Sequence, residues 1–570
     1  MQSRPANESP SPFGRSLGES LTLGRHLLLV AAPLGVLVGL AIAGYDWVVN
    51  ELLWRRVTEH SVAAQIVAPF FGMLLAGVIV RLFRVPSPSM ADEVVKAYHD
   101  AERDMPLKTA AWKLTASFAT MGFGGSAGME GASKWLGATI GSGLQGLVNR
   151  LGPGALRWST KSTLIVGGSA GIAAIFRAPL SGAIMGVESP YKRDLAHEAL
   201  IPALVASATS FWTFAHFRPA TPYFPITFQY ALNTRDLLVA LPLGVAAGLA
   251  SHLFLTTLAR LRRRFDGLRV AGPVRYGLGG LLLVAIAWVA WRVVGAPVTL
   301  QAGLPVSNAL LNGRFGLWAA LAIFGLKLLA TSVTFGAGGV GGLFVPSATM
   351  GAALGAAFDA VFAPSHPGVF TLLGIAAFSG ASYNSLLFSA VFVAESTGNV
   401  ALVVPSLVAS TVAFVVAAGV SNSRSQRLRR QTWRERLREV PVTAVMTRQL
   451  VTARPEDTLE VFSHSVLLEH HFKALPVVDE GGMLKGMIAL AHLRTVPMTE
   501  WRRVQVAEVM DPDVRFIRTH DAVADAEGVL REGPYDYVPV VDPTSDVLVG
   551  IVSDSDIYRS LGEHATHATA

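Results

Sequence analysis

The stretch Gly124-Gly125-Ser126-Ala127-Gly128-Met129-Glu130-Gly131-Ala132 decides the fold of this chain. It holds one acidic residue, Glu130, among glycines, which let backbone N–H groups approach a ligand closely. An apolar helix of small residues is expected to follow, from Ser133 to Leu147. If the helix begins near Gly131, the positive end of its dipole points at this stretch, and a carboxylate there imitates an anion. We therefore expect Glu130 to occupy an anion site when ionised and to leave it when protonated. The alternative is a glutamate that only stabilises a helix N-terminus.

The composition indicates a membrane protein. Of 570 residues, 51% are hydrophobic and only 15% are charged, and the mean hydropathy is +0.44. Several apolar blocks are long enough to span a bilayer, whereas others are short and interrupted by Gly or Pro, as in helices that line a cavity. The longest blocks are Leu27–Gly44, Val62–Val80, Thr163–Val187, Leu237–Leu258, Leu278–Val294, Leu317–Val333, Leu372–Ala394 and Ala401–Val420.

The net charge of +7 is explained by topology rather than by a nucleic-acid partner. One cluster of arginines lies at 260–264, and seven arginines lie between Arg424 and Arg438. The positive-inside rule places both clusters, and with them both chain termini, in the cytoplasm.

Residues 1–25 are polar and lack a signal-peptide pattern, so a bacterial-type inner (plasma) membrane is expected. With no cysteine, disulfides and thiolate metal sites are excluded.

The two halves of the apolar region repeat the same features. Gly128–Ala132 aligns with Gly342–Pro346, and Phe176–Ser189 aligns with Tyr383–Ser396, which pairs Glu188 with Glu395. Interrupted helices in corresponding positions of two halves predict a transport site near the middle of the membrane.

After Val420 the composition becomes that of a soluble α/β region with its own repeat. Leu475–Asp479 and Gly486–Ile488 recur as Val538–Asp542 and Gly550–Val552. Helices are expected between these strands, at Leu459–His470 and Val523–Arg531.

These motifs resemble the CLC chloride channel/transporter family over residues 20–425. The family signatures GSGIP, G-[KR]-E-G-P and G-x-F-x-P stand here as Pro88-Ser89-Met90-Ala91-Asp92, Gly128-Met129-Glu130-Gly131-Ala132 and Gly342-Leu343-Phe344-Val345-Pro346. The third is intact. The second replaces the basic residue by Met129 and the proline by Ala132, and in the first Ser89 is the matching residue. The C-terminal part resembles a tandem pair of CBS domains.

The resemblance implies an all-α polytopic membrane protein with inverted (antiparallel) repeats of CLC type, followed by an α/β CBS pair. It also implies a homodimer in which each subunit has its own pore. The expected boundaries are 1–25 for a cytoplasmic N-terminal segment, 26–420 for the transmembrane domain, 421–440 for a basic linker, 441–497 for the first CBS domain and 505–562 for the second.

By the same resemblance, Glu130 is the gating glutamate. The residues implied to hold the anion are Ser89, Gly128, Met129, Gly131, Gly342, Leu343, Phe344, Val345 and Ser423. Ser423 falls at the place of an inner tyrosine in the family, and Tyr383 is expected only to pack within its helix.

Proton-coupled members of the family often carry a second, inner glutamate, and Ser189 stands at that position here. Because serine does not titrate, we expect proton coupling to be weak or absent. The neighbouring Glu188 is expected to be structural and to pair with Arg177 or Arg193.

The predicted function is therefore chloride transport that is channel-like or weakly proton-coupled, rather than enzymatic catalysis. One alternative is a proton-coupled antiporter of chloride or of another small anion such as fluoride or nitrate. A second is a CBS-regulated divalent-cation transporter, which needs clustered acids, whereas Glu130, Glu188 and Glu395 are widely spread. A third is a nucleotide sensor with a mere membrane anchor, which needs no interrupted helices.

No cofactor is required for this function. Ser553 and Asp556 match a CBS pattern in which the hydroxyl meets a phosphate and the aspartate meets ribose hydroxyls of an adenine nucleotide. The first CBS unit has Ala489 and His492 at these places. A nucleotide-free dimerisation module is the alternative. His464, His470 and His471 are interpreted as a solvated helix face rather than as metal ligands.

Overall fold

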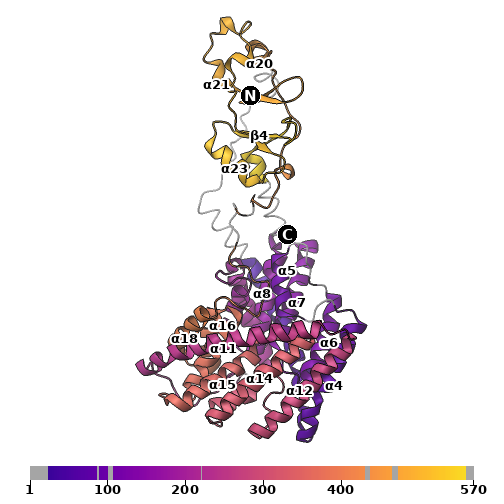
Figure 1. The fold of residues 1–570 in the computed structure, drawn as a ribbon, viewed down its shortest axis with the longest axis vertical. Coiled ribbons are helices and arrows are strands. Elements are labelled where there is room, and N and C mark those ends of the chain that lie inside the picture. Colours follow the sequence, from indigo (N-terminus) through magenta and orange to yellow (C-terminus); the bar gives the residue numbers. More distant parts are fainter. Residues whose placement is uncertain are drawn as a thin grey trace. The chain divides into compact units, whose positions relative to one another are not determined.

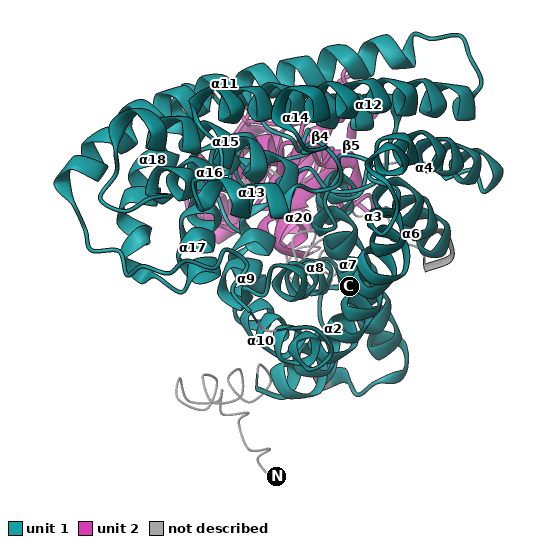
Figure 2. Cartoon of the chain, turned by 90° about the horizontal axis from the view of Figure 1, so that it is seen from below, with its two compact units in different colours: residues 1–430, 569–570 teal, residues 431–568 magenta. Residues whose placement is uncertain are grey.

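The computed structural model describes residues 24–85, 89–100, 105, 107–219, 221–430, 435, 437–464 and 473–559. Most of the predicted N-terminal segment 1–25 lies outside these ranges, as do Pro88, His470, His471 and the end of the second CBS domain at 560–562. The chain forms two compact units, 1–430 with 569–570, and 431–568 (Figure 2). The boundary falls within the predicted basic linker.

Unit 1 is helical, and within the described residues seven of its helices are long and apolar enough to cross a membrane. A helical run from Gly24 to Thr58 contains α2 (Ala32–Asp46) and α3 (Arg55–Thr58). The other principal helices (Figure 1 and Figure 2) are α4 (Val62–Leu82), α5 (Ala91–His99), α6 (Leu107–Gly122), α7 (Glu130–Leu151), α8 (Thr160–Phe176), α9 (Pro179–Glu188), α10 (Leu200–Phe217), α11 (Thr234–Asp266), α12 (Gly272–Val294), α13 (Leu304–Leu311), α14 (Leu317–Ala337), α15 (Phe344–Phe362), α16 (Val369–Tyr383), α17 (Leu386–Thr397) and α18 (Val403–Val416).

The predicted repeat is present in the packing of unit 1. Helix α7 packs along α8, and α15 packs along α16 in the corresponding place. Both pairs touch backbone to backbone. A Cβ on Gly137 would lie 2.1 Å from the carbonyl oxygen of Gly167, and a Cβ on Gly351 would lie 2.4 Å from that of Gly374. Only glycine permits so close a contact.

The two short helices α9 and α17 follow sharp breaks in the chain. Arg177 ends α8 at φ 56°, and Asn384 ends α16 at φ 51°, both in the left-handed region. Pro179 then begins α9. The predicted interruptions therefore lie at equivalent points of the two halves.

The free N-termini of these short helices are capped by each other's carboxylates. Glu188, at the end of α9, accepts N–H hydrogen bonds from Leu387 at 3.1 Å and Phe388 at 3.0 Å in the first turn of α17. Glu395, near the end of α17, accepts from the N–H groups of Leu180 at 2.9 Å and Ser181 at 2.7 Å in α9. Since lipid offers no donors or acceptors, this exchange satisfies helix ends that water cannot reach.

The expectation that Glu188 pairs with Arg177 or Arg193 is wrong. Its two carboxylate oxygens are taken by the N–H groups of α17. The Arg177 guanidinium donates instead to the backbone and hydroxyl oxygens of Thr221, at 3.1 and 2.8 Å. A helix N-terminus supplies several aligned donors, so it competes successfully with a single arginine.

Unit 2 contains the predicted α/β repeat. In the first repeat, β1 (Ala474–Val478) pairs antiparallel with β2 (Leu484–Ala489). In the second, β3 (Ile517–Arg518) lies parallel to β4 (Tyr537–Val541), which pairs antiparallel with β5 (Leu548–Ser553). The described helices are α20 (Leu459–His464), α21 (Leu490–Leu493), α22 (Val506–Val509) and α23 (Val523–Glu532).

The turns that follow β1 and β4 use the same residue type. Asp479 accepts N–H hydrogen bonds from Gly481 and Met483, and Asp542 accepts from Thr544 and Ser545. The Thr544 hydroxyl is the main reason that the pKa of Asp542 is lowered to about 2. This turn is therefore stabilised at neutral pH and loses that contribution as the pH falls through the lowered pKa.

We expect Glu395→Ala to destabilise the membrane unit by about 1–3 kcal/mol, because it leaves the α9 N–H groups of Leu180 and Ser181 without acceptors. The melting temperature of the purified protein in detergent should fall, and Glu395→Gln, which keeps one acceptor oxygen, should lower it less. Glu59→Ala, at an exposed ion pair with Arg55, is the control. Equal melting temperatures for Glu395→Ala and the control would contradict the role of this cap.

Candidate anion pathway

The N-termini of α7 and α15 meet at the centre of unit 1. Gly128 and Gly342, which are equivalent in the two halves, form an antiparallel bridge. The Gly128 N–H donates to the Gly342 carbonyl at 2.8 Å, and the Gly342 N–H donates to the Gly128 carbonyl at 2.7 Å. Because equivalent residues pair with each other, the bridge joins the two halves at the same point of each repeat.

The Glu130 carboxylate lies on the N-terminus of α15. Its Oε1 accepts N–H hydrogen bonds from Phe344 at 2.5 Å and from Val345 at 3.3 Å, and the residue is 3% exposed. Its Oε2 has no hydrogen-bond partner among the described residues. The carboxylate thus occupies the helix end at which an anion would bind.

Glycines make room for this carboxylate on two sides. A Cβ on Gly128 would lie 2.0 Å from Oε2, and a Cβ on Gly342 would lie 2.2 Å from Oε1. Gly131 lies against the backbone of Gly341, which a Cβ would approach to 2.8 Å. The glycines of both signature stretches are therefore required by the close approach of the two helix ends.

An aromatic cluster surrounds the first residue of α15. The ring of Phe344 lies 5.0 Å from that of Phe176, 5.0 Å from Phe388, 5.3 Å from Phe392 and 5.6 Å from Tyr383, measured between centroids. The four phenylalanine rings are buried, so the side of the helix N-terminus that they cover is apolar, whereas Tyr383 is only partly buried.

A cavity of about 330 Å³ adjoins the beginning of α15, where Gly341, Gly342 and Leu343 line it. It brings together Ser89, Gly342, Leu343 and Ser423 of the predicted site, while Glu130, Phe344 and Val345 lie at the adjoining N-terminus of α15. Tyr383 also lines the cavity, which sequence reasoning did not expect of it. The charged lining residues are Lys96, Arg262, Arg275, Arg424, Asp92 and Asp266. Four cations against two carboxylates favour the entry of an anion.

Asp92 holds the hydroxyl group of Ser423. Oδ1 of Asp92 accepts from the Ser423 hydroxyl at 2.7 Å and from the Ser425 N–H at 3.0 Å, and Oδ2 accepts from the Ser425 hydroxyl at 3.1 Å. Sequence reasoning missed Asp92, although it stands in the first turn of α5, three residues after Ser89. The carboxylate fastens the segment that follows α18 to the beginning of α5.

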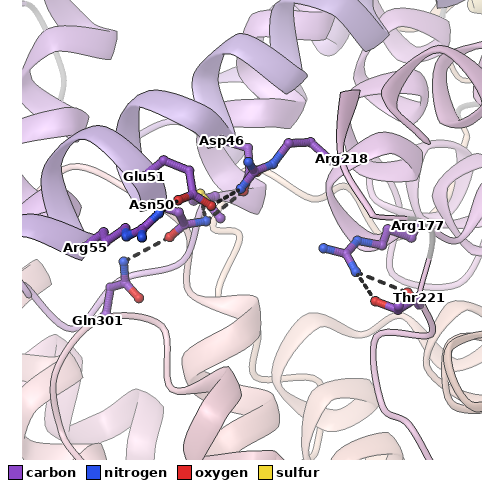
Figure 3. Close-up of polar contacts among 9 residues, drawn as sticks. Asp46, Asn50, Glu51, Arg55, Arg177, Arg218, Thr221 and Gln301 are labelled. Carbon is purple, nitrogen blue, oxygen red and sulfur yellow. Dashed lines mark hydrogen bonds and ion pairs between the residues drawn. The ribbon is translucent and has the colours of Figure 1, made fainter. Parts of the chain in front are cut away.

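Met129 faces a polar network on the helical run Gly24–Thr58 (Figure 3). The amide nitrogen of Asn50 lies 3.7 Å from the Met129 sulfur and donates to Oδ1 of Asp46 at 2.7 Å. Arg218 forms ion pairs with Asp46 and with Glu51. Although Met129 removes the positive charge of the family signature, a guanidinium still stands beside this network, supplied by the residue that follows α10.

Ser189 has a charged neighbour that the sequence did not indicate. The amine of Lys134 donates to the Ser189 hydroxyl at 2.6 Å, and Lys134 is 3% exposed. The signal available in the sequence was a lysine within a helix of small, apolar residues, one turn after Glu130.

In unit 2, Ser553 and Asp556 lie together on a cavity of about 930 Å³ lined by both CBS repeats. Oδ2 of Asp556 accepts from the Ser553 hydroxyl at 2.7 Å and from the Ser553 N–H at 3.0 Å. In the first repeat Ala489 also lines the cavity, and its N–H donates to Nδ1 of His492 at 3.4 Å. The cavity is large enough for a nucleotide.

Comparisons with known proteins agree with this architecture. The family profile described as voltage gated chloride channel matches residues 72–418, and the CBS domain profile matches 442–498 and 506–563. The voltage-gated ClC-type chloride channel ClcB of Escherichia coli K12 is 26% identical over 416 residues, which cover 69% of this chain and 96% of that protein. An uncharacterized protein of Methanocaldococcus jannaschii is 28% identical over 364 residues, 64% of this chain and 87% of that protein.

Solved structures of low sequence identity share the fold. The structure of a CLC-type fluoride/proton antiporter matches with a TM-score of 0.62 and 23% identity, covering 74% of this chain and all of that one. A eukaryotic CLC transporter matches with a TM-score of 0.60 and 19% identity, covering 94% of this chain and 98% of that one. With its profile match over most of unit 1, this chain belongs to the voltage-gated chloride channel (CLC) family and carries two CBS domains at its C-terminus.

Proposed function

We propose that this protein carries chloride, or another small anion, through a pathway that Glu130 closes at the N-terminus of α15. The observation that carries the proposal is the Glu130 carboxylate bound to the N–H groups of Phe344 and Val345. The name of the Escherichia coli relative, a chloride channel, supports chloride as the anion.

The mechanism is competition for a helix end. An ionised carboxylate and a free anion both seek the same backbone N–H groups, so the pathway is closed while Glu130 holds them. A protonated carboxyl group carries no charge, binds the helix end less tightly and gives the place to the anion. The cations of the cavity raise the local anion concentration, but no cation touches the carboxylate among the described residues, so the anion is not trapped.

Two modes of transport agree with this gate. Channel-like or weakly coupled passage follows if Ser189 leaves the inner side without a titratable group. Proton-coupled antiport is the second candidate, and the bond between Lys134 and Ser189 favours it because an amine can carry a proton. A divalent-cation transporter is not favoured, since cations outnumber carboxylates in the cavity lining.

The proposal also includes the membrane location, the oligomeric state and the ligand of the CBS pair. We place the protein in a bacterial-type inner membrane as a homodimer, with both termini in the cytoplasm, where the arginines of 424–438 lie near anionic lipid head groups. Ser553 and Asp556 would hold the phosphate and ribose of an adenine nucleotide in the cavity of the CBS pair.

Glu130→Gln should raise anion flux at neutral pH and remove most of its pH dependence, because a neutral amide neither imitates an anion nor titrates. Chloride efflux from vesicles containing the purified protein, measured from pH 4 to 8, tests this. Glu59→Gln, at an exposed helix end, should behave as the wild type. If Glu130→Gln keeps the wild-type flux at every pH, the gate is assigned to the wrong residue.

Asp556→Asn should weaken the binding of adenine nucleotides about tenfold or more, because it weakens both the ribose contact and the bond that orients Ser553. Calorimetric titration of the full-length protein with ATP, ADP and AMP measures this. Asp546→Asn, on an exposed turn of the same unit, is the matched control. Nucleotide binding that Asp556→Asn leaves unchanged would place the site elsewhere.

A further inference from the structure

Among the described residues of unit 1, three lysines are buried, and two of them have structural partners. Lys113 pairs with the carboxylate of Glu93. Lys327 donates to the backbone carbonyls of Thr299 at 3.2 Å and Gln301 at 2.6 Å, which fixes a loop. A buried ammonium is costly, and strong acceptors of this kind offset that cost.

Lys134 differs from both. The partner that the structure gives its amine is the neutral hydroxyl of Ser189, at 2.6 Å, and no described carboxylate lies within 4.0 Å. The hydroxyl in turn donates to the carbonyl of Gly186 at 2.9 Å. A neutral amine keeps two N–H donors, so the Ser189 hydroxyl can accept from Lys134 in either protonation state while it donates to the Gly186 carbonyl. This contact therefore survives a change in protonation, whereas an ion pair such as that of Lys113 does not.

The surroundings of Lys134 separate it from the anion cavity. Neither Lys134 nor Ser189 lines that cavity, so the amine is not an anion ligand there. Its side chain packs against Gly168 of α8. The charged group that acts on it electrostatically is Asp92 of α5, which does line the cavity. Nearby on α9, the carboxylate of Glu188 is bound to α17. Glu93 of α5 is paired with Lys113 of α6.

Lys134 also lies on the same face of α7 as Glu130, the proposed gate. It follows Glu130 by one turn of α7, which places the two Cβ atoms about 6 Å apart. One end of this pair is the carboxylate that closes the anion site, and the other reaches the residue at the expected inner proton position, Ser189.

We infer that Lys134 is the inner proton carrier of this protein, taking the place of the glutamate that Ser189 replaces. The inference rests on the proposed anion transport and makes that transport proton-coupled. It reverses the expectation, drawn from Ser189 alone, that coupling is weak or absent.

The step is a proton transfer without redox change. A proton leaves Nζ of the Lys134 ammonium and, through intervening water, joins the Glu130 carboxylate, which leaves a neutral amine and a neutral carboxyl group. The carboxyl group releases α15, and an anion takes its place. The amine then takes a proton from a hydronium ion on the cavity side, past Asp92, and water remains. Proton and anion therefore share Glu130, but the last step of the proton to Glu130 runs through Lys134, which does not line the anion cavity.

Reconstituted vesicles with a chloride gradient test this inference, with chloride and proton movement recorded together. As chloride flows down its gradient, the wild type should move protons in the opposite direction, even against a proton gradient. Lys134→Met should lower the number of protons moved per chloride about tenfold or more, while chloride flux remains measurable. Lys134→Arg keeps a buried cation and a donor but does not release its proton, so the ratio should also be lost.

A rescue variant separates proton transfer from packing. Adding Ser189→Glu to Lys134→Met returns a titratable group to the same place and should restore much of the ratio. Lys327→Met, which removes a buried amine bonded to backbone, should leave the ratio unchanged.

Two outcomes would overturn the inference and leave the proposed anion transport standing. One is an unchanged ratio in both Lys134→Met and Lys134→Arg. The other is chloride flux without proton movement in the wild type. A wild type that moves no anion at all would refute the proposed function itself, and the inference with it.

Discussion

The structure depends on one electrostatic constraint, which is that two helix N-termini point at the same place inside an apolar unit. Their unpaired N–H groups are positive and need a negative partner that neither lipid nor the aromatic rings around Phe344 can supply. The Glu130 carboxylate supplies it from the end of one helix to the end of the other. An anion has the same charge, and the proposed gate rests on this interchangeability of carboxylate and anion at a helix end.

The same constraint recurs at the other broken helices and is met there permanently. Glu188 and Glu395 each cap the helix that carries the other, so neither end is left for a ligand. Three glutamates thus share one chemical role at helix ends. They differ in the hydrogen bonding of the second carboxylate oxygen. Both oxygens of Glu188 and of Glu395 accept hydrogen bonds, whereas Oε2 of Glu130 has no partner among the described residues. That difference is the reason we assign the proposed gate to Glu130 rather than to Glu188 or Glu395.

Close backbone contact is the second condition on which the pathway depends. The α7–α8 and α15–α16 pairs approach until only glycine fits between them, which fixes the position of each helix relative to its partner. Asp92 adds a tie in the cavity wall by holding Ser423 and Ser425. This tie fixes the segment that follows α18 to the beginning of α5.

The sequence by itself determined the membrane class, the two related halves, the interrupted helices and the soluble α/β repeat, because each is written as a local pattern of hydrophobicity, glycine and proline. The resemblance of its motifs to the CLC family also led us to expect Glu130 and the Gly342–Val345 stretch at one site, and the structure brings the two together. Only the tertiary structure decided which side chains meet across the halves. In the structure Glu188 binds the N-terminus of α17 rather than the expected arginine. Asp92 binds the hydroxyl of Ser423, and Lys134 binds that of Ser189. These contacts join residues far apart in the chain. Such partners are set by the packing of the helices, and the local sequence around each residue does not indicate them.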